Sequence, residues 1–90
     1  MSLNITQDFQ RHCFSAQVDG HRCVVDYVLN QGVMTITHTG VPDAVGGRGI
    51  AAELTKFALD TARKDGLKIV PVCSYTAAYV RRHPEYADIL

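Results

Sequence analysis

The sequence predicts one α+β domain: a mixed sheet, mainly antiparallel, with one long crossover helix and a short C-terminal helix. Three observations carry this prediction. Apolar and polar side chains alternate over residues 1–40, which is the period of half-buried strands. A helical period of about 3.6 replaces the alternation over residues 50–62. A short apolar segment follows at residues 67–72. Because 90 residues fit a single domain, we assign residues 1–90 to one unit.

The N-terminal half predicts an antiparallel meander. Phe14, Ala16 and Val18 share one side of the first ribbon, and Asp19-Gly20 is a typical two-residue hairpin turn. Closely spaced turns favour antiparallel pairing, and the later segments are rich in β-branched and aromatic residues. We expect strands at residues 14–18, 23–29 and 33–38, a second turn at 30–32, and a weakly marked opening strand near 4–7.

The main helix is expected to run from the glycine-rich stretch before Ile50 up to Gly66, with apolar residues at helical spacing from Ile50 to Ala62 and charged side chains on its outer surface. Gly66 suits the position just after the last helical residue. At about 1.5 Å per residue the helix would cross roughly 25–28 Å, enough to cover one face of the sheet. It leads into residues 67–72, which we expect to pair in parallel. Ser74 is expected to cap a second helix that stops before Pro84.

Composition and charge exclude several classes of protein. Nine basic and nine acidic residues cancel, so the basic excess of a nucleic-acid binder is missing. No segment approaches the ~20 apolar residues of a membrane span, and the N-terminus lacks a signal-peptide pattern. Cys13, Cys23 and Cys73 form no C-x-x-C pair, which argues against a disulfide framework or a zinc site. We expect a cytoplasmic protein without bound metal, as a monomer or weak homodimer.

A glycine-rich loop, Gly46-Gly47-Arg48-Gly49-Ile50-Ala51, stands between the meander and the main helix. Glycines permit unusual backbone angles and let a ligand approach the main chain closely. The free N–H groups and the dipole of the helix start favour an anion. The loop is therefore a candidate phosphate or pyrophosphate cradle; a turn that only starts the helix is the alternative. It is no Walker loop, since no lysine follows, and no Rossmann fingerprint, since it follows a meander.

This segment, from His38 to Leu54, resembles motif A of the GCN5-related N-acetyltransferase (GNAT) family. The usual form, Gln/Arg-x-x-Gly-x-Gly/Ala, falls on residues 46–51. Residues 69–75 and 79–86 resemble a small branch of stand-alone domains of this length, so the resemblance covers the whole chain. It implies a GNAT-like acyl-CoA N-acyltransferase fold, acetyl-CoA or CoA as cofactor, and acetyl transfer to an amine.

The resemblance also implies residue roles. The first motif position is Gly46 instead of Gln or Arg, so phosphate contact falls on the backbone of residues 47–51, with Arg48 as charge partner. The pantetheine arm of the cofactor would run along Thr39–Val41. Cys73 would lie near the acetyl thioester as a proposed acetyl acceptor. A helix start can lower the pKa of a thiol, which raises the fraction of nucleophilic thiolate. A buried, inert cysteine is the alternative.

Two further catalytic candidates carry open alternatives. His38 could accept a proton from the amine or polarise Cys73, or it could be structural. Tyr79 shares a helix face with Tyr75 and lies where larger relatives often place a general acid, or it could simply pack. Arg82, or Arg81, could reach a phosphate or be surface charge.

The expected cofactor-binding set is Thr39, Val41, Gly46, Gly47, Arg48, Gly49, Ile50, Ala51, Ser74 and Arg82. His12, His21 and His83 are expected at the surface, and Cys13 and Cys23 in structural positions.

The acceptor amine is left open among a protein lysine, a polyamine and a small amine. Two rival functions remain at this stage. One is a CoA or acyl-CoA binding module without efficient catalysis, because the short chain has no strand-borne glutamate as an obvious base. The other is a small interaction or scaffold domain that has kept the fold without the ligand.

Overall fold

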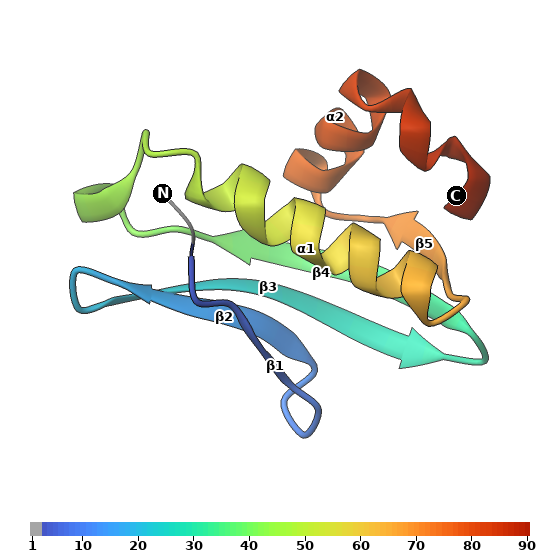
Figure 1. The fold of residues 1–90 in the computed structure, drawn as a ribbon, viewed down its shortest axis with the longest axis horizontal. Coiled ribbons are helices and arrows are strands. Elements are labelled where there is room, and N and C mark those ends of the chain that lie inside the picture. The colour runs from blue at the N-terminus through green and yellow to red at the C-terminus, as the bar shows by residue number, and fades with distance from the viewer. Residues whose placement is uncertain (1–2) are drawn as a thin grey trace.

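The computed structural model describes residues 3–90, which form a five-stranded sheet with helix α1 (Ile50–Lys64) across one face (Figure 1). The first four strands pair antiparallel, and the fifth pairs parallel to the fourth, as a crossover through α1 requires. The predicted fold class is confirmed. In sheet order the strands are β1 (Thr6–Asp8), β2 (Cys13–Val18), β3 (His21–Asn30), β4 (Val33–Gly40) and β5 (Lys68–Pro71).

Both predicted hairpin turns form with the backbone angles that two-residue turns need. Asp19 and Gly20 have φ of 50° and 79°, and Gln31 and Gly32 have φ of 50° and 80°. Positive φ at both central residues is typical of type I′ turns, whose twist matches that of the strands. Local turn chemistry therefore sets the register of β2, β3 and β4.

Helix α1 ends at the predicted glycine. Gly66 has φ of 70°, its N–H donates to the Arg63 carbonyl, and the Leu67 N–H donates to the Ala62 carbonyl. This pair of bonds is a Schellman motif, which satisfies carbonyls at the helix end. The helix has 15 residues, so it spans about 22 Å, which is less than the roughly 25–28 Å expected.

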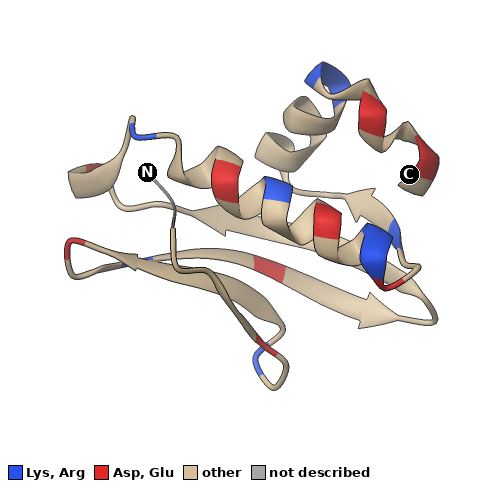
Figure 2. Ribbon diagram, viewed as in Figure 1, with Lys and Arg blue, Asp and Glu red and all other residues tan. Residues whose placement is uncertain are grey.

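The core lies between α1 and the facing side of the sheet. Leu54 and Ala58 of α1 are fully buried against strand residues such as Phe14 and Val25. Phe57, although on the predicted apolar face, is 39% exposed and meets Phe14 edge-on with ring centroids 5.7 Å apart. The outer face of α1 carries alternating charges (Figure 2).

The C-terminal part forms helix α2 (Ser74–Arg82) and a 3₁₀ segment η2 (Pro84–Ile89). Cys73, not Ser74, is the N-cap of α2, and no side-chain cap hydrogen bond forms. The prediction for Ser74 was wrong because the chain leaves extended geometry one residue earlier: Cys73 has φ of −62° and ψ of 130°. No helix within residues 3–90 is long and apolar enough to cross a membrane.

Candidate functional site

Strand β4 contains a bulge that the sequence did not reveal. Tyr27 of β3 pairs with Ile36, whereas the preceding residue, Asp26, pairs with His38. Thr37 is therefore an extra residue in β4. Such a bulge reverses which side chains point to each face of the sheet beyond it.

The bulge decides where His38 lies. Thr39 pairs with the fully buried Val25 and so shares the face of the sheet that α1 covers. His38 lies on the opposite face: a Cβ on Gly40 would stand 3.1 Å from His38 Nε2 and 3.4 Å from Val24. The structure therefore does not bring His38 and Cys73 together, so a polarising contact between His38 and the Cys73 thiol is not supported.

An opening lies beside the second half of β4. The pairing of β4 with β5 ends at Ile36 and Pro71, and the Cys73 N–H then donates a 2.9 Å hydrogen bond to the Ile36 carbonyl. From there the chain turns into α2, while β4 continues to Gly40 paired with β3 alone. The backbone edge of residues 37–40 on the β5 side is therefore available to an extended ligand.

Cys73 lies at this opening. Its side chain is half-buried, and its Sγ is 3.5 Å from the Thr39 hydroxyl of β4. Burial would raise the pKa of the Cys73 thiol, but the Thr39 hydroxyl and the nearby amides of Thr76 and Tyr75 favour the thiolate and outweigh it, so the pKa lies below its ordinary value. By contrast, Cys23 is fully buried and burial raises its pKa. The structure thus distinguishes Cys73 from the structural thiols.

The glycine loop is held by a 3₁₀ turn, η1 (Asp43–Val45), which was not predicted. Val45 is 1% exposed and anchors this turn in the core. The Gly46 N–H donates to the Asp43 carbonyl at 3.1 Å, so Gly46 offers a ligand neither a side chain nor a free amide. Gly46 therefore has no free hydrogen-bond donor for a cofactor, and its expected role in cofactor binding is not supported.

The rest of the loop has the geometry of an anion cradle. Gly47 and Gly49 have φ of 77° and 78°, and a Cβ on either would meet no atom within 4 Å. These positions favour glycine and leave open space above the backbone. The first helical bond runs from Glu53 N–H to the Gly49 carbonyl, so the amides of residues 50–52 have no partner within the helix. The Ile50 side chain is 3% exposed and fixes this helix start to the core.

Arg48 forms a contact that the sequence did not indicate. Its Nη1 lies 2.6 Å from Asp19 Oδ2 in the turn between β2 and β3. Both side chains are well exposed, so the pair is open to exchange with another anion. In the structure a carboxylate of the same chain holds the Arg48 guanidinium, and its role as charge partner of a phosphate stays a prediction.

The remaining expected residues are more scattered. Tyr79 is 8% exposed, and burial raises the pKa of its hydroxyl. Its ring stacks on the His83 ring with the two centroids 4.0 Å apart. Six residues separate it from Cys73, about 240° around the helix, which supports the packing alternative. Arg82 is exposed at the far end of α2 from Cys73, while Val41 is half-buried against the core and Ser74 is exposed. His83, expected at the surface, is half-buried.

Sequence reasoning missed Asp19 and Thr76 as site residues. Asp19 lies 29 positions from Arg48, so no local signal joins the two. Thr76 follows the cysteine by three residues, which is the spacing of an N-cap and the third helical position. The spacing would have identified Thr76 from the sequence only if Cys73 had been predicted as the N-cap of the helix.

Comparisons with known proteins show the family to which the chain belongs. Residues 13–89 match the family described as GCN5-related N-acetyl-transferase. Protein NATD1 of Mus musculus is 38% identical over 85 residues, covering 91% of this chain and 77% of the mouse protein. NATD1 of Homo sapiens is 35% identical over 85 residues, covering 91% and 75%. The solution structure of a Staphylococcus aureus protein described as GCN5-like superposes with a TM-score of 0.76 at 30% identity, covering 99% of this chain and 89% of that one.

Proposed function

The chain belongs to the GCN5-related N-acetyltransferase family, and we propose that it binds acetyl-CoA where β4 and β5 separate and acetylates an amine through Cys73. The observation that carries the proposal is the position of Cys73. It is the N-cap of α2, hydrogen-bonded to Thr39, at the opening beside the unpaired edge of β4. A nucleophilic thiol needs such a partly exposed site with a lowered pKa.

The residues present fit the cofactor. Gly47 and Gly49 leave open space above their backbone, and the amides of residues 50–52 are free to donate to a diphosphate. Arg48 can add a charge-assisted bond once it leaves Asp19. The backbone of Thr39–Val41, which continues from the unpaired edge of β4, can bond the amides of a pantetheine arm as another strand would.

The chemistry of Cys73 follows from its thiolate. Acetyl-CoA supplies an activated acyl thioester. The Cys73 thiolate attacks the carbonyl carbon, the bond from that carbon to the CoA sulfur breaks, and CoA leaves as a thiolate that takes a proton from solvent. A neutral amine then attacks the thioester on Cys73. Cys73 leaves as a thiolate, an amide forms, and the amine proton passes to solvent.

Intact-mass measurement after mixing with acetyl-CoA tests this proposal. We expect the wild-type protein to gain the mass of one acetyl group, and to lose it on addition of an amine such as spermidine. Cys73→Ser should gain no hydroxylamine-labile acetyl group, whereas Cys23→Ser should behave as wild type. An undiminished turnover of acetyl-CoA by Cys73→Ser would overturn the covalent route.

One observation favours a second function, CoA or acyl-CoA binding without efficient catalysis. Among residues 3–90, no histidine or carboxylate is hydrogen-bonded to Cys73, and His38 lies on the other face of the sheet. Calorimetry with CoA and backbone NMR shifts distinguish the functions. A pure binder shows saturable heat and shifts at residues 47–51 with no acetyl adduct, whereas a scaffold shows neither.

A further inference from the structure

The hydroxyl of Thr76 is buried and forms no hydrogen bond in the part of the chain that the structure describes. Its side chain is 0% exposed, in the first turn of α2, and Oγ1 has no partner within hydrogen-bond geometry among residues 3–90. Buried hydroxyls are normally paired, because an unpaired one has lost its hydrogen bonds to water. Thr55 of α1 is the other such residue, far along the chain from Cys73. A state of the protein in which this hydroxyl gains a hydrogen-bond partner would therefore be stabilised.

The Cys73 sulfur is a polar group near Thr76 that can change its protonation state. Thr76 stands three residues after the N-cap, so its side chain lies on the same side of the helix as Cys73. The Thr76 hydroxyl is close enough to help lower the pKa of the Cys73 thiol, together with the Thr76 amide. A rotation of this hydroxyl towards the sulfur would complete the bond.

Thr39 approaches the same sulfur from the sheet. Its Oγ1 lies 3.5 Å from Cys73 Sγ across 34 residues of sequence. A neutral thiol can donate its proton to only one acceptor, whereas a thiolate accepts several bonds and donates none. Two hydroxyls that approach the sulfur, one from β4 and one from α2, therefore suit the thiolate better than the thiol.

We propose that Thr39 and Thr76 form a pair of hydroxyl donors that stabilises the Cys73 thiolate, with Thr39 donating from β4 and Thr76 from α2. The inference rests on the proposed function in giving this thiolate a nucleophilic role. It also extends that role, because the same donors stabilise Cys73 when it leaves its own thioester. Removal of either hydroxyl should slow both acetylation of Cys73 and transfer to the amine.

Alkylation by iodoacetamide measures the thiolate without acetyl-CoA. Its rate at Cys73, followed by mass spectrometry across pH, gives the midpoint of thiol ionisation. We expect Thr39→Val and Thr76→Val each to raise this midpoint by about one unit, and the double variant to raise it further. Thr76→Ser keeps the hydroxyl and should restore the wild-type midpoint. Thr55→Val, the matched buried control, should leave it unchanged.

The outcomes separate the two proposals. An unchanged midpoint in folded Thr76→Val overturns the role of Thr76, and an unchanged midpoint in Thr39→Val overturns that of Thr39. Should Thr76→Val not fold by circular dichroism, Thr76→Ala measures the same loss. Raised midpoints without any acetyl adduct from acetyl-CoA would support the donor pair and refute acetyl transfer through Cys73. An acetyl adduct together with unchanged midpoints would support acetyl transfer through Cys73 and refute the donor pair.

Discussion

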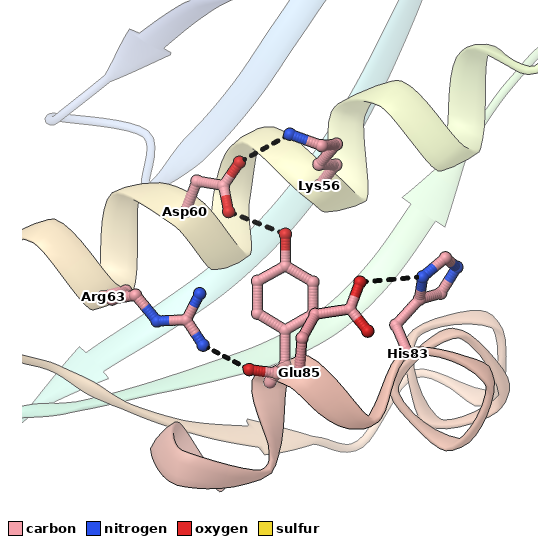
Figure 3. A network of polar contacts seen from close by, with 6 residues as sticks. Lys56, Asp60, Arg63, His83 and Glu85 are labelled. Carbon is pink, nitrogen blue, oxygen red and sulfur yellow. Dashed lines mark hydrogen bonds and ion pairs between the residues drawn. The ribbon is translucent and has the colours of Figure 1, made fainter.

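The hydroxyl of Tyr86 donates a 2.6 Å hydrogen bond to Asp60 Oδ1 and thereby joins η2 to the middle of α1. Lys56 bonds the other Asp60 oxygen at 2.9 Å, and Arg63 lies over the Tyr86 ring while donating to the Glu85 carbonyl (Figure 3). These contacts account for part of the segment at residues 79–86 that resembles the small GNAT branch. Its side chains fasten the C-terminal segment to α1, and through it they support the helix that carries Cys73.

Tyr86→Phe should destabilise the protein by about 1–2 kcal/mol, because it removes a buried hydrogen bond to a carboxylate and keeps the ring. Urea unfolding followed by circular dichroism measures the change in the free energy of unfolding. Tyr75→Phe is the matched control, since Tyr75 is 38% exposed. Equal stability of Tyr86→Phe and wild type would show that the bond contributes nothing net.

Asp60 predicts a loss of stability in acid. Burial would raise the pKa of this carboxyl, but hydrogen bonds from Tyr86 and Lys56 outweigh it and hold the pKa below its ordinary value. The stabilisation is therefore present above the unfolded pKa, about 4, and is lost as pH falls through the folded value. Asp60→Asn should flatten the fall in melting temperature below about pH 4, whereas Glu53→Gln on the same helix should not. A parallel pH profile for Asp60→Asn would contradict this assignment.

Local signals predicted most of the fold. Asp19-Gly20, Gln31-Gly32 and Gly66 each adopt a backbone conformation that their own side chains favour, so the turns and the end of α1 follow from neighbouring residues. The alternation in β2 and β3 likewise identified the buried face. Such features need no knowledge of distant parts of the chain.

The site was less predictable because it depends on tertiary register. A single extra residue, Thr37, moves His38 to the face away from Cys73, and no residue near His38 signals a bulge. The pairs Arg48–Asp19 and Thr39–Cys73 join residues 29 and 34 positions apart. The glycine cradle was identified correctly as a helix start, but the Gly46 amide bond to Asp43 depends on a 3₁₀ turn that the sequence did not mark.

Asp19 competes with a cofactor phosphate for Arg48. Asp19→Asn should therefore tighten CoA binding by about two- to fivefold, because it frees Arg48 and removes a negative charge near the loop. Asparagine tolerates the positive φ of 50° at this turn position, so the hairpin should be kept. Calorimetry with CoA at low salt measures the change. Asp65→Asn makes the same charge change at the other end of α1 and should leave the affinity unchanged; weaker binding by Asp19→Asn would show that Asp19 positions Arg48 instead.

Gly46 offers the clearest gain-of-function test. The family form has Gln or Arg at this position, and the Gly46 backbone, with φ of −66° and ψ of 158°, suits any L residue. A Cβ there would stand 3.4 Å from the Asp43 carbonyl oxygen, which is ordinary contact. Gly46→Gln should therefore fold and present an amide donor to the diphosphate. We expect CoA to bind about fivefold more tightly, as one added hydrogen bond provides.

Gly46→Leu separates this donor from the effects of size and backbone. Both substitutions should raise the free energy of unfolding by about 0.4–1 kcal/mol, because they reduce the freedom of the unfolded chain at a position without strain. Only Gly46→Gln can donate a hydrogen bond, so only this variant should tighten CoA binding in calorimetry. Equal affinities for the two variants would mean that the side chain at position 46 does not reach the phosphates, and the diphosphate would then have to be held by the amides of residues 47–52 alone.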